Sequence, residues 1–155
     1  IKPLHHYEAV LRWTGGRKGP VRGYRDYSRE YEVQLPGKPL LTGSADPSFL
    51  GDAALINPED MLLAALSACH MLSFFAECAF AKVEVHEYED QASGTMLFEG
   101  RGGQFTDVLL RPHALLSNCD EATALELHKR AHKACFIARS VNFPVRHEAV
   151  SRFRA

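Results

Sequence analysis

The strongest constraint on the fold is a long apolar segment that opens at Asn57-Pro58-Glu59-Asp60. Asn57 suits a helix N-cap, Pro58 suits the first helical position, and the two acids favour the positive end of the helix dipole. Apolar residues then continue on most faces from Met61 to Phe80. Because a helix that is apolar nearly all round must be covered, the segment predicts a central helix buried in a core or an interface.

The flanking segments alternate between apolar and polar residues, which is typical of strands. The expected strands are residues 4–13, 23–35 (as one long strand or two short ones), 82–90, 93–99, 104–116 and 145–153. A loop rich in Gly and Pro is expected over 36–57, and a second helix from Asp120-Glu121 to about Ser140. This order predicts an α+β fold with helices packed on antiparallel sheets, in a single domain over residues 1–155.

Charge and hydropathy argue against two classes of partner. The formal net charge is −1, so no basic field is present to attract nucleic acid. The apolar segment is interrupted by Ser67, His70, Ser73 and Glu77, which makes it a poor membrane span. The N-terminus lacks the pattern of a signal peptide, and we therefore expect a cytoplasmic protein.

Four cysteines occur, at positions 69, 78, 119 and 135, and without an export signal they are expected to be reduced thiols. Cys69 lies in the central helix and Cys135 on the apolar stripe of the second helix. If their Cα atoms approach within disulfide range, the pair can cycle between dithiol and disulfide, but the spacing does not establish that approach. A reactive Cys69 also requires a cation from elsewhere in the fold. The alternative is that all four thiols are inert core residues.

The eight histidines raise the question of a metal site. His128 and His132 are spaced i, i+4, which can hold a metal, yet neither an HExxH motif nor a CxxC pair is present. We therefore expect no metal site.

Two motifs resemble those of the OsmC/Ohr family of osmotically inducible peroxidases and organic hydroperoxide reductases. Asn57-Pro58-Glu59, Leu62-Leu63-Ala64-Ala65 and Ser67-Ala68-Cys69 resemble the core motif, with ten positions between Glu59 and Cys69 as in the family. Ala131–Cys135 matches the second motif, and Thr14-Gly15-Gly16-Arg17 resembles the turn that carries an arginine in the hydroperoxide reductase branch. The resemblance covers nearly the whole chain in order.

The resemblance implies an intertwined homodimer of α+β subunits that reduces organic hydroperoxides or hydrogen peroxide. It implies Cys69 as the attacking thiol and Cys135 as the thiol that resolves its sulfenic acid as a disulfide. An external dithiol or a small thiol would reduce that disulfide. Arg17 is implied as the cation beside the thiolate and Glu59 as the carboxylate that orients the arginine. No metal or organic cofactor is implied.

The distance between Glu59 and Cys69 restricts how the glutamate can act. Ten residues of continuous helix span about 15 Å, so Glu59 does not reach Cys69 of its own chain directly. We expect it to act on a cysteine of a neighbouring subunit, or through Arg17 on a folded-back loop.

The chain also departs from the family pattern. Phe136-Ile137-Ala138 follows Cys135, where the best-known members have a proline directly after the cysteine and a serine two places beyond it. Arg29 competes with Arg17 for the role of the cation. The sequence therefore indicates a side branch of the family, and the alternative function is the binding or modification of another small apolar molecule on the same fold.

Overall fold

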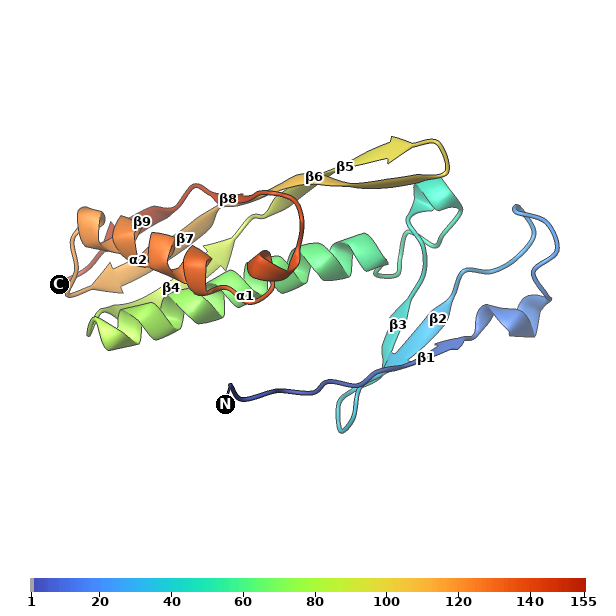
Figure 1. Cartoon of the computed structure of the whole chain (residues 1–155), viewed down its shortest axis with the longest axis horizontal. Helices are drawn as coiled ribbons and strands as arrows, with labels where there is room; N and C mark the ends of the chain where they lie inside the picture. Colours follow the sequence, from blue (N-terminus) through green and yellow to red (C-terminus); the bar gives the residue numbers. More distant parts are fainter. Residues whose placement is uncertain (1) are drawn as a thin grey trace. The chain divides into compact units, whose positions relative to one another are not determined.

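The computed structural model describes residues 2–155, which form two compact units (Figure 1). Unit 1 extends to Met61 and unit 2 begins at Leu62, so the boundary falls near the start of helix α1 (Pro58–Phe80). The expectation of a single domain over residues 1–155 stays a prediction.

Unit 1 contains a three-stranded antiparallel sheet in the order β1-β2-β3. Its elements are β1 (Val10–Trp13), the 3-10 helix η1 (Gly15–Lys18), β2 (Tyr31–Gln34), β3 (Leu41–Gly43) and the 3-10 helix η2 (Pro47–Phe49). The predicted strands 4–13 and 23–35 are therefore too long, and the predicted loop 36–57 contains β3 and η2. Alternation misled the prediction because residues 23–27 form turns in which local groups satisfy the backbone: the N–H of Gly23 donates to Asp26 Oδ1 at 2.7 Å.

The predicted start of the central helix is confirmed. Asn57 Oδ1 accepts a hydrogen bond from the N–H of Asp60 at 2.8 Å, and Asp60 Oδ2 accepts one from the N–H of Asn57 at 3.1 Å. This reciprocal cap satisfies two N–H groups near the helix start. It fixes where α1 begins and so sets the position of Glu59 in the first turn.

Helix α1 is long and apolar enough to cross a membrane by length and composition alone, with a mean hydropathy of 1.6 over its most apolar window. Its buried residues, however, are Leu66, His70, Phe74 and Cys78, spaced four apart along one face. That face lies in the core of unit 2, where it contacts both sheets and the second helix. The interior of the protein thus explains why this face is apolar.

Unit 2 carries two three-stranded sheets, in the orders β4-β7-β9 and β5-β6-β8. The strands are β4 (Glu84–Asp90), β5 (Ser93–Glu99), β6 (Gly102–Leu110), β7 (Pro112–Ser117), β8 (Val145–His147) and β9 (Val150–Phe153). Within each sheet the first pair is antiparallel, whereas β8 and β9 run parallel to β6 and β7. Each sheet therefore has the expected antiparallel pair and, in addition, a third strand that runs parallel to its neighbour.

Two predicted strands of unit 2 are each divided in two. The predicted strand 104–116 breaks at Arg111, whose N–H donates to the side-chain oxygen Asp90 Oδ1 at 2.6 Å instead of to a backbone oxygen of a neighbouring strand. Pro112, which has no N–H, follows directly. The predicted strand 145–153 is divided into β8 and β9, which belong to different sheets.

The second helix, α2 (Glu121–Ala134), begins where it was predicted but ends earlier. Asp120 caps it by accepting a hydrogen bond from the N–H of Thr123 at 2.8 Å. Cys135 then has an extended backbone with ψ of 112°, and a short 3-10 helix, η3 (Ala138–Ser140), follows. The predicted continuation to Ser140 and the position of Cys135 inside the helix are therefore wrong: the apolar pattern persists, but the backbone turns at Cys135.

The core of unit 2 has two clusters, and α1 contributes to both. In the first, Phe74 and Cys78 of α1 pack with Ala114 and Leu116 of β7 and with the apolar side of α2. In the second, Leu66 of α1 packs with strands β6 and β8. Figure 1 shows α1 and α2 of this unit beside the strands that they cover. This packing sets the positions of the cysteines on the two helices.

Candidate functional site

Two of the four predicted site residues, Cys69 and Cys135, come together in unit 2. Cys69 is partly buried on α1, and Cys135 is 1% exposed at the C-terminal end of α2. Their side chains lie close enough for Cys69 to raise the pKa of Cys135, and both are free thiols. The sequence could not establish this approach, because the two residues are far apart in the chain and meet only through the packing of α1 against α2.

The two thiols differ in their access to solvent. Burial, together with the hydrogen bond to Cys69 and the charge of its sulfur, raises the pKa of Cys135 to about 11. Cys135 therefore keeps its proton at neutral pH and can donate it to the sulfur of Cys69. Because the thiolate is the nucleophile in thiol chemistry, this asymmetry suits Cys69 to attack and Cys135 to react second.

The remaining cysteines lie away from this pair. Cys78 is buried in the first core cluster, with Cys119 packed against that cluster. Burial raises the pKa of both thiols, that of Cys78 to about 12. They remain protonated at neutral pH, as expected of structural thiols.

Glu59 lines a pocket of about 480 Å³ within unit 1. The walls are mostly apolar and aromatic and come from β1, β2, the turns between them, η2 and the first residues of α1. The lining residues are Trp13, Val21, Tyr27, Ser28, Arg29, Tyr31, Ser44, Ala45, Asp46, Phe49, Pro58 and Glu59. A pocket of this size with apolar walls and few polar groups is typical of small-molecule sites.

Two oxygen atoms in this pocket are buried without a partner. Among residues 2–155, neither Glu59 Oε2 nor the hydroxyl of Tyr31 has a hydrogen-bond partner. Burial and the nearby carboxylates of Glu59 and Asp60 raise the pKa of Tyr31, so its hydroxyl stays protonated. Since buried polar groups are nearly always satisfied, these two oxygens are suited to bind a polar group that enters the pocket.

Of the two candidate arginines, Arg29 is the one that lines the pocket with Glu59. Its guanidinium lies 3.8 Å from the centre of the Tyr27 ring and 5.0 Å from that of Tyr24, and it donates hydrogen bonds to the backbone oxygens of both tyrosines. These contacts fix the orientation of the cation. Arg17 is exposed in η1 and, in the described part of the chain, is not among the residues that line this pocket.

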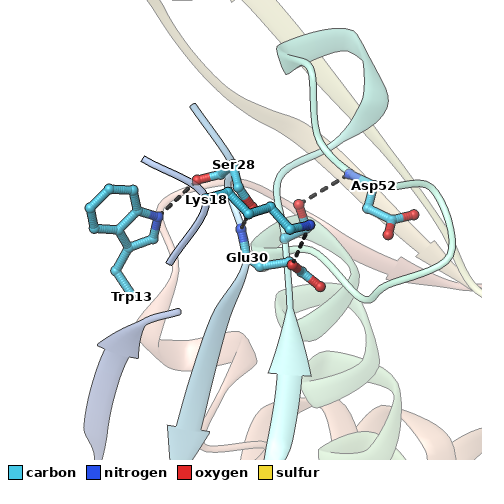
Figure 2. A network of polar contacts seen from close by, with 6 residues as sticks. Trp13, Lys18, Ser28, Glu30 and Asp52 are labelled. Atoms are coloured by element: carbon cyan, nitrogen blue, oxygen red, sulfur yellow. Dashed lines mark hydrogen bonds and ion pairs between the residues drawn. The ribbon is translucent and has the colours of Figure 1, made fainter. Parts of the chain in front are cut away.

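A polar network supports the wall of the pocket (Figure 2). The indole N–H of Trp13 donates to the backbone oxygen of Ser28 at 2.8 Å, and Lys18 forms an ion pair with Glu30 at 3.3 Å. Gly15 is required beside them, because an added Cβ would lie 2.5 Å from both the Ser28 oxygen and the Trp13 indole nitrogen. The Thr-Gly-Gly-Arg turn thus positions Trp13 in the pocket wall, a role that the sequence did not indicate.

The predicted site residues therefore fall into two groups. Cys69 and Cys135 belong to unit 2 and contact each other. Arg17 and Glu59 belong to unit 1, where Glu59 shares a pocket with Arg29. Among residues 2–155, no group of three or more His, Cys, Asp or Glu side chains is arranged to hold a metal ion.

Comparisons with known proteins agree with this fold. The sequence profile described as "OsmC-like protein" matches residues 51–149. A search of curated proteins found no match. Among solved structures, an OsmC-like protein of unknown function from Vibrio cholerae is 30% identical, with a TM-score of 0.83 over 95% of this chain and 100% of that one.

Two hydroperoxide resistance proteins share the fold at lower identity. The organic hydroperoxide resistance protein of Elizabethkingia anophelis is 20% identical, with a TM-score of 0.68 over 99% of this chain and 100% of that one. The protein OhrB of Bacillus subtilis is 18% identical, with a TM-score of 0.62 over 96% and 100%. The chain thus belongs to the OsmC-like family, as its motifs indicated, and it has the α+β fold of that family.

Proposed function

We propose that the protein is a thiol-dependent peroxidase that reduces organic hydroperoxides with Cys69 and Cys135. The observation that carries the proposal is the proximity of the two thiols, one partly exposed and one buried, which is close enough for Cys69 to raise the pKa of Cys135. Partial exposure lets a substrate reach Cys69, and contact with a second thiol is the usual mark of a cysteine that cycles through a disulfide.

The proposed reaction has three steps. The Cys69 thiolate attacks one peroxide oxygen, the O–O bond breaks, and the products are an alcohol and Cys69 sulfenic acid. The sulfur of Cys135 then displaces the hydroxyl group from Cys69, which gives water and a Cys69–Cys135 disulfide. An external dithiol or small thiol reduces this disulfide and is itself oxidised. No metal or organic cofactor is needed for the electron balance.

The pocket of unit 1, taken by itself, suits an organic molecule better than hydrogen peroxide. Its volume and aromatic walls fit a bulky apolar group. Hydrogen peroxide would fill only a small part of the pocket and would contact few of its apolar walls. We propose Arg29, or else Arg17, as the cation that stabilises the Cys69 thiolate, and Glu59 as the carboxylate that orients it. Arg29 is the better supported of the two, because it is held rigidly in the pocket that contains Glu59.

We further propose that the protein acts as a homodimer in the cytoplasm. Leu72 and Phe80 on α1 are 61% and 80% exposed in the single chain, and exposed apolar residues of this size favour a partner surface. A second subunit also offers a cysteine to Glu59, which the helix keeps away from Cys69 of its own chain. Four free cysteines fit a reducing compartment.

The test is consumption of cumene hydroperoxide and of hydrogen peroxide in the presence of a dithiol. We expect faster consumption of cumene hydroperoxide, and we expect Cys69→Ser to abolish it. Cys78→Ser is the matched control, because this thiol is buried on the same helix but outside the pair. Full activity in Cys69→Ser would contradict the proposal.

The second candidate function is binding of a small apolar molecule without peroxide chemistry. The pocket with two unpartnered oxygens favours it. Trp13 is the single tryptophan of the chain and lines this pocket, so its fluorescence reports occupancy directly. A fluorescence change with cumyl alcohol, together with thiols that resist oxidation by hydroperoxide, would favour this function over the first.

A further inference from the structure

Four histidines gather in unit 2 beside the helices that carry the thiol pair. His70 lies on α1, His128 and His132 on α2, and His147 on β8. The ring centres of His70, His128 and His147 lie 5.3 to 6.1 Å apart, and that of His132 lies 5.7 Å from His147. Neither the sequence motifs nor the proposed reaction assigns a role to this cluster.

The geometry within the cluster is that of a hydrogen bond rather than of a metal site. His70 Nε2 lies 3.0 Å from His128 Nδ1, and the two rings are coplanar to within 4° with their centres 5.3 Å apart. These values require a nearly straight N–H···N bond in the plane of both rings. His70 Nε2 and His128 Nδ1 are therefore aimed at each other and not at a shared third point, which a metal ion would need.

The bond is shielded from water. His70 is 1% exposed and His128 is fully buried, and the ring of Phe74 stacks on His128 at 3.8 Å. Burial and the neighbouring histidines lower the pKa of His70 to about 4 and that of His128 to about 3. Both rings are thus neutral at physiological pH and share a single proton across the bond. In a water-free environment such a bond is stronger and more directional than at the surface.

The bond joins the two elements that carry the reactive thiols. His70 directly follows Cys69 on α1, and His128 lies two turns before Cys135, whose own N–H donates to the backbone oxygen of His132 at 3.3 Å. Apolar side chains of the first core cluster, such as Phe74 and Leu127, also pack α1 against α2. Apolar contact keeps helices together but is not directional, whereas a straight hydrogen bond fixes their register.

We propose that the His70–His128 hydrogen bond is a positioning device that holds α1 and α2 in the register that places the Cys69 and Cys135 thiols next to each other. The two histidines do not take part in bond breaking. They set the effective concentration of one thiol toward the other, and so the ease with which the disulfide forms. This inference rests on the thiol pair of the proposed function but does not require that a peroxide be the oxidant.

The test is the equilibrium of the protein with glutathione at pH 7. Oxidised glutathione and the dithiol exchange to give the protein disulfide and two molecules of reduced glutathione, so the equilibrium constant is the effective concentration of the pair. In His70→Gln the amide extends to about the position of Nε2 and keeps the bond, whereas in His70→Asn it stops near Nδ1 and loses it. The converse pair is His128→Asn, which keeps the bond, and His128→Gln, which loses it.

We expect about a tenfold lower effective concentration in His70→Asn and His128→Gln, which corresponds to a reduction potential about 30 mV higher. His70→Gln and His128→Asn should stay within about twofold of the wild type. Val108→Ala, in the second core cluster away from α2, is the control for destabilisation and should leave the equilibrium unchanged. Thermal unfolding identifies the variants that fold. If a variant at His70 does not fold, the two variants at His128 still test the proposal, and the reverse also holds.

The possible failures are distinguishable. An unchanged equilibrium in folded His70→Asn or His128→Gln would overturn the positioning role and leave the proposed function standing. The same loss of effective concentration in His70→Gln and His128→Asn would also overturn it, because the imidazole rings, and not the hydrogen bond between them, would then position the thiols. A wild-type protein that forms no Cys69–Cys135 disulfide in excess oxidised glutathione would overturn both proposals.

Discussion

The buried histidines make the stability of the protein sensitive to mild acid. Burial lowers the pKa of His70 to about 4 and that of His128 to about 3, whereas both lie near 6.5 in the unfolded chain. The unfolded chain therefore binds more protons than the folded chain as the pH falls below 6.5. By linkage, the free energy of unfolding decreases over this range until the folded-state pKa values are reached.

The expected decrease in the free energy of unfolding is large for a protein of this size. Each histidine removes about 1.4 kcal/mol per pH unit within this window. Between pH 7 and pH 5 the pair together removes up to about 4 kcal/mol, against a total of about 5–15 kcal/mol for a typical domain. Burial also lowers the pKa of His147, with help from His132 and Lys129, so its contribution has the same sign.

The assay is urea unfolding followed by circular dichroism at pH 7 and pH 5, with the wild type and the double variant His70→Gln, His128→Asn. The double variant keeps amide groups at the bonding positions but cannot titrate. We expect the wild type to lose several kcal/mol between the two pH values and the double variant to lose much less. Equal unfolding free energies for the wild type at both pH values, or the same loss in the double variant, would refute the reasoning.

Three further predictions concern the thiols, the arginines and the helix cap. Cys135→Ser should allow one oxidation of Cys69 and then its over-oxidation to sulfinic acid, seen by mass spectrometry; a stable sulfenic acid under repeated turnover would contradict this. Arg29→Ala should slow oxidation of Cys69 at least about tenfold, whereas Arg17→Ala should slow it less; the reverse order, measured by stopped flow, would return the role to Arg17. Asn57→Ala should cost about 1 kcal/mol of stability in urea unfolding, and no loss would show that the cap does not stabilise α1.

The parts of the fold that the sequence predicted are those with local causes. The cap at Asn57 and the apolar run after it determine α1 through interactions within one turn and one face. Asp120 determines the start of α2 in the same way. A cap residue and the apolar pattern after it involve only a few neighbouring residues, so both can be recognised from the sequence.

The errors have non-local causes. The break at Arg111 depends on a hydrogen bond to Asp90, which lies on another strand, and the parallel pairing of β8 depends on where α2 returns the chain. The early end of α2 depends on the conformation of Cys135, since the apolar pattern continues past it. Periodicity does not contain this information, because it records which residues are apolar but not which segments meet.

The same distinction applies to the candidate site. The family motifs identified Cys69 and Cys135, but their contact depends on how α1 packs against α2. The pocket that joins Arg29 to Glu59, and the bond between His70 and His128, likewise connect residues far apart in the chain. The i, i+4 spacing of His128 and His132 was visible in the sequence, but it suggested a metal and gave no sign of a partner on α1.

Intact mass after one equivalent of cumene hydroperoxide, followed by peptide mapping, decides whether Cys69 and Cys135 form a redox pair. The account predicts loss of the two thiol hydrogens and a disulfide between the peptides that contain Cys69 and Cys135, with Cys78 and Cys119 still reduced. Four free thiols and an unchanged mass would contradict it, and would mean that this OsmC-like fold serves a purpose other than peroxide reduction.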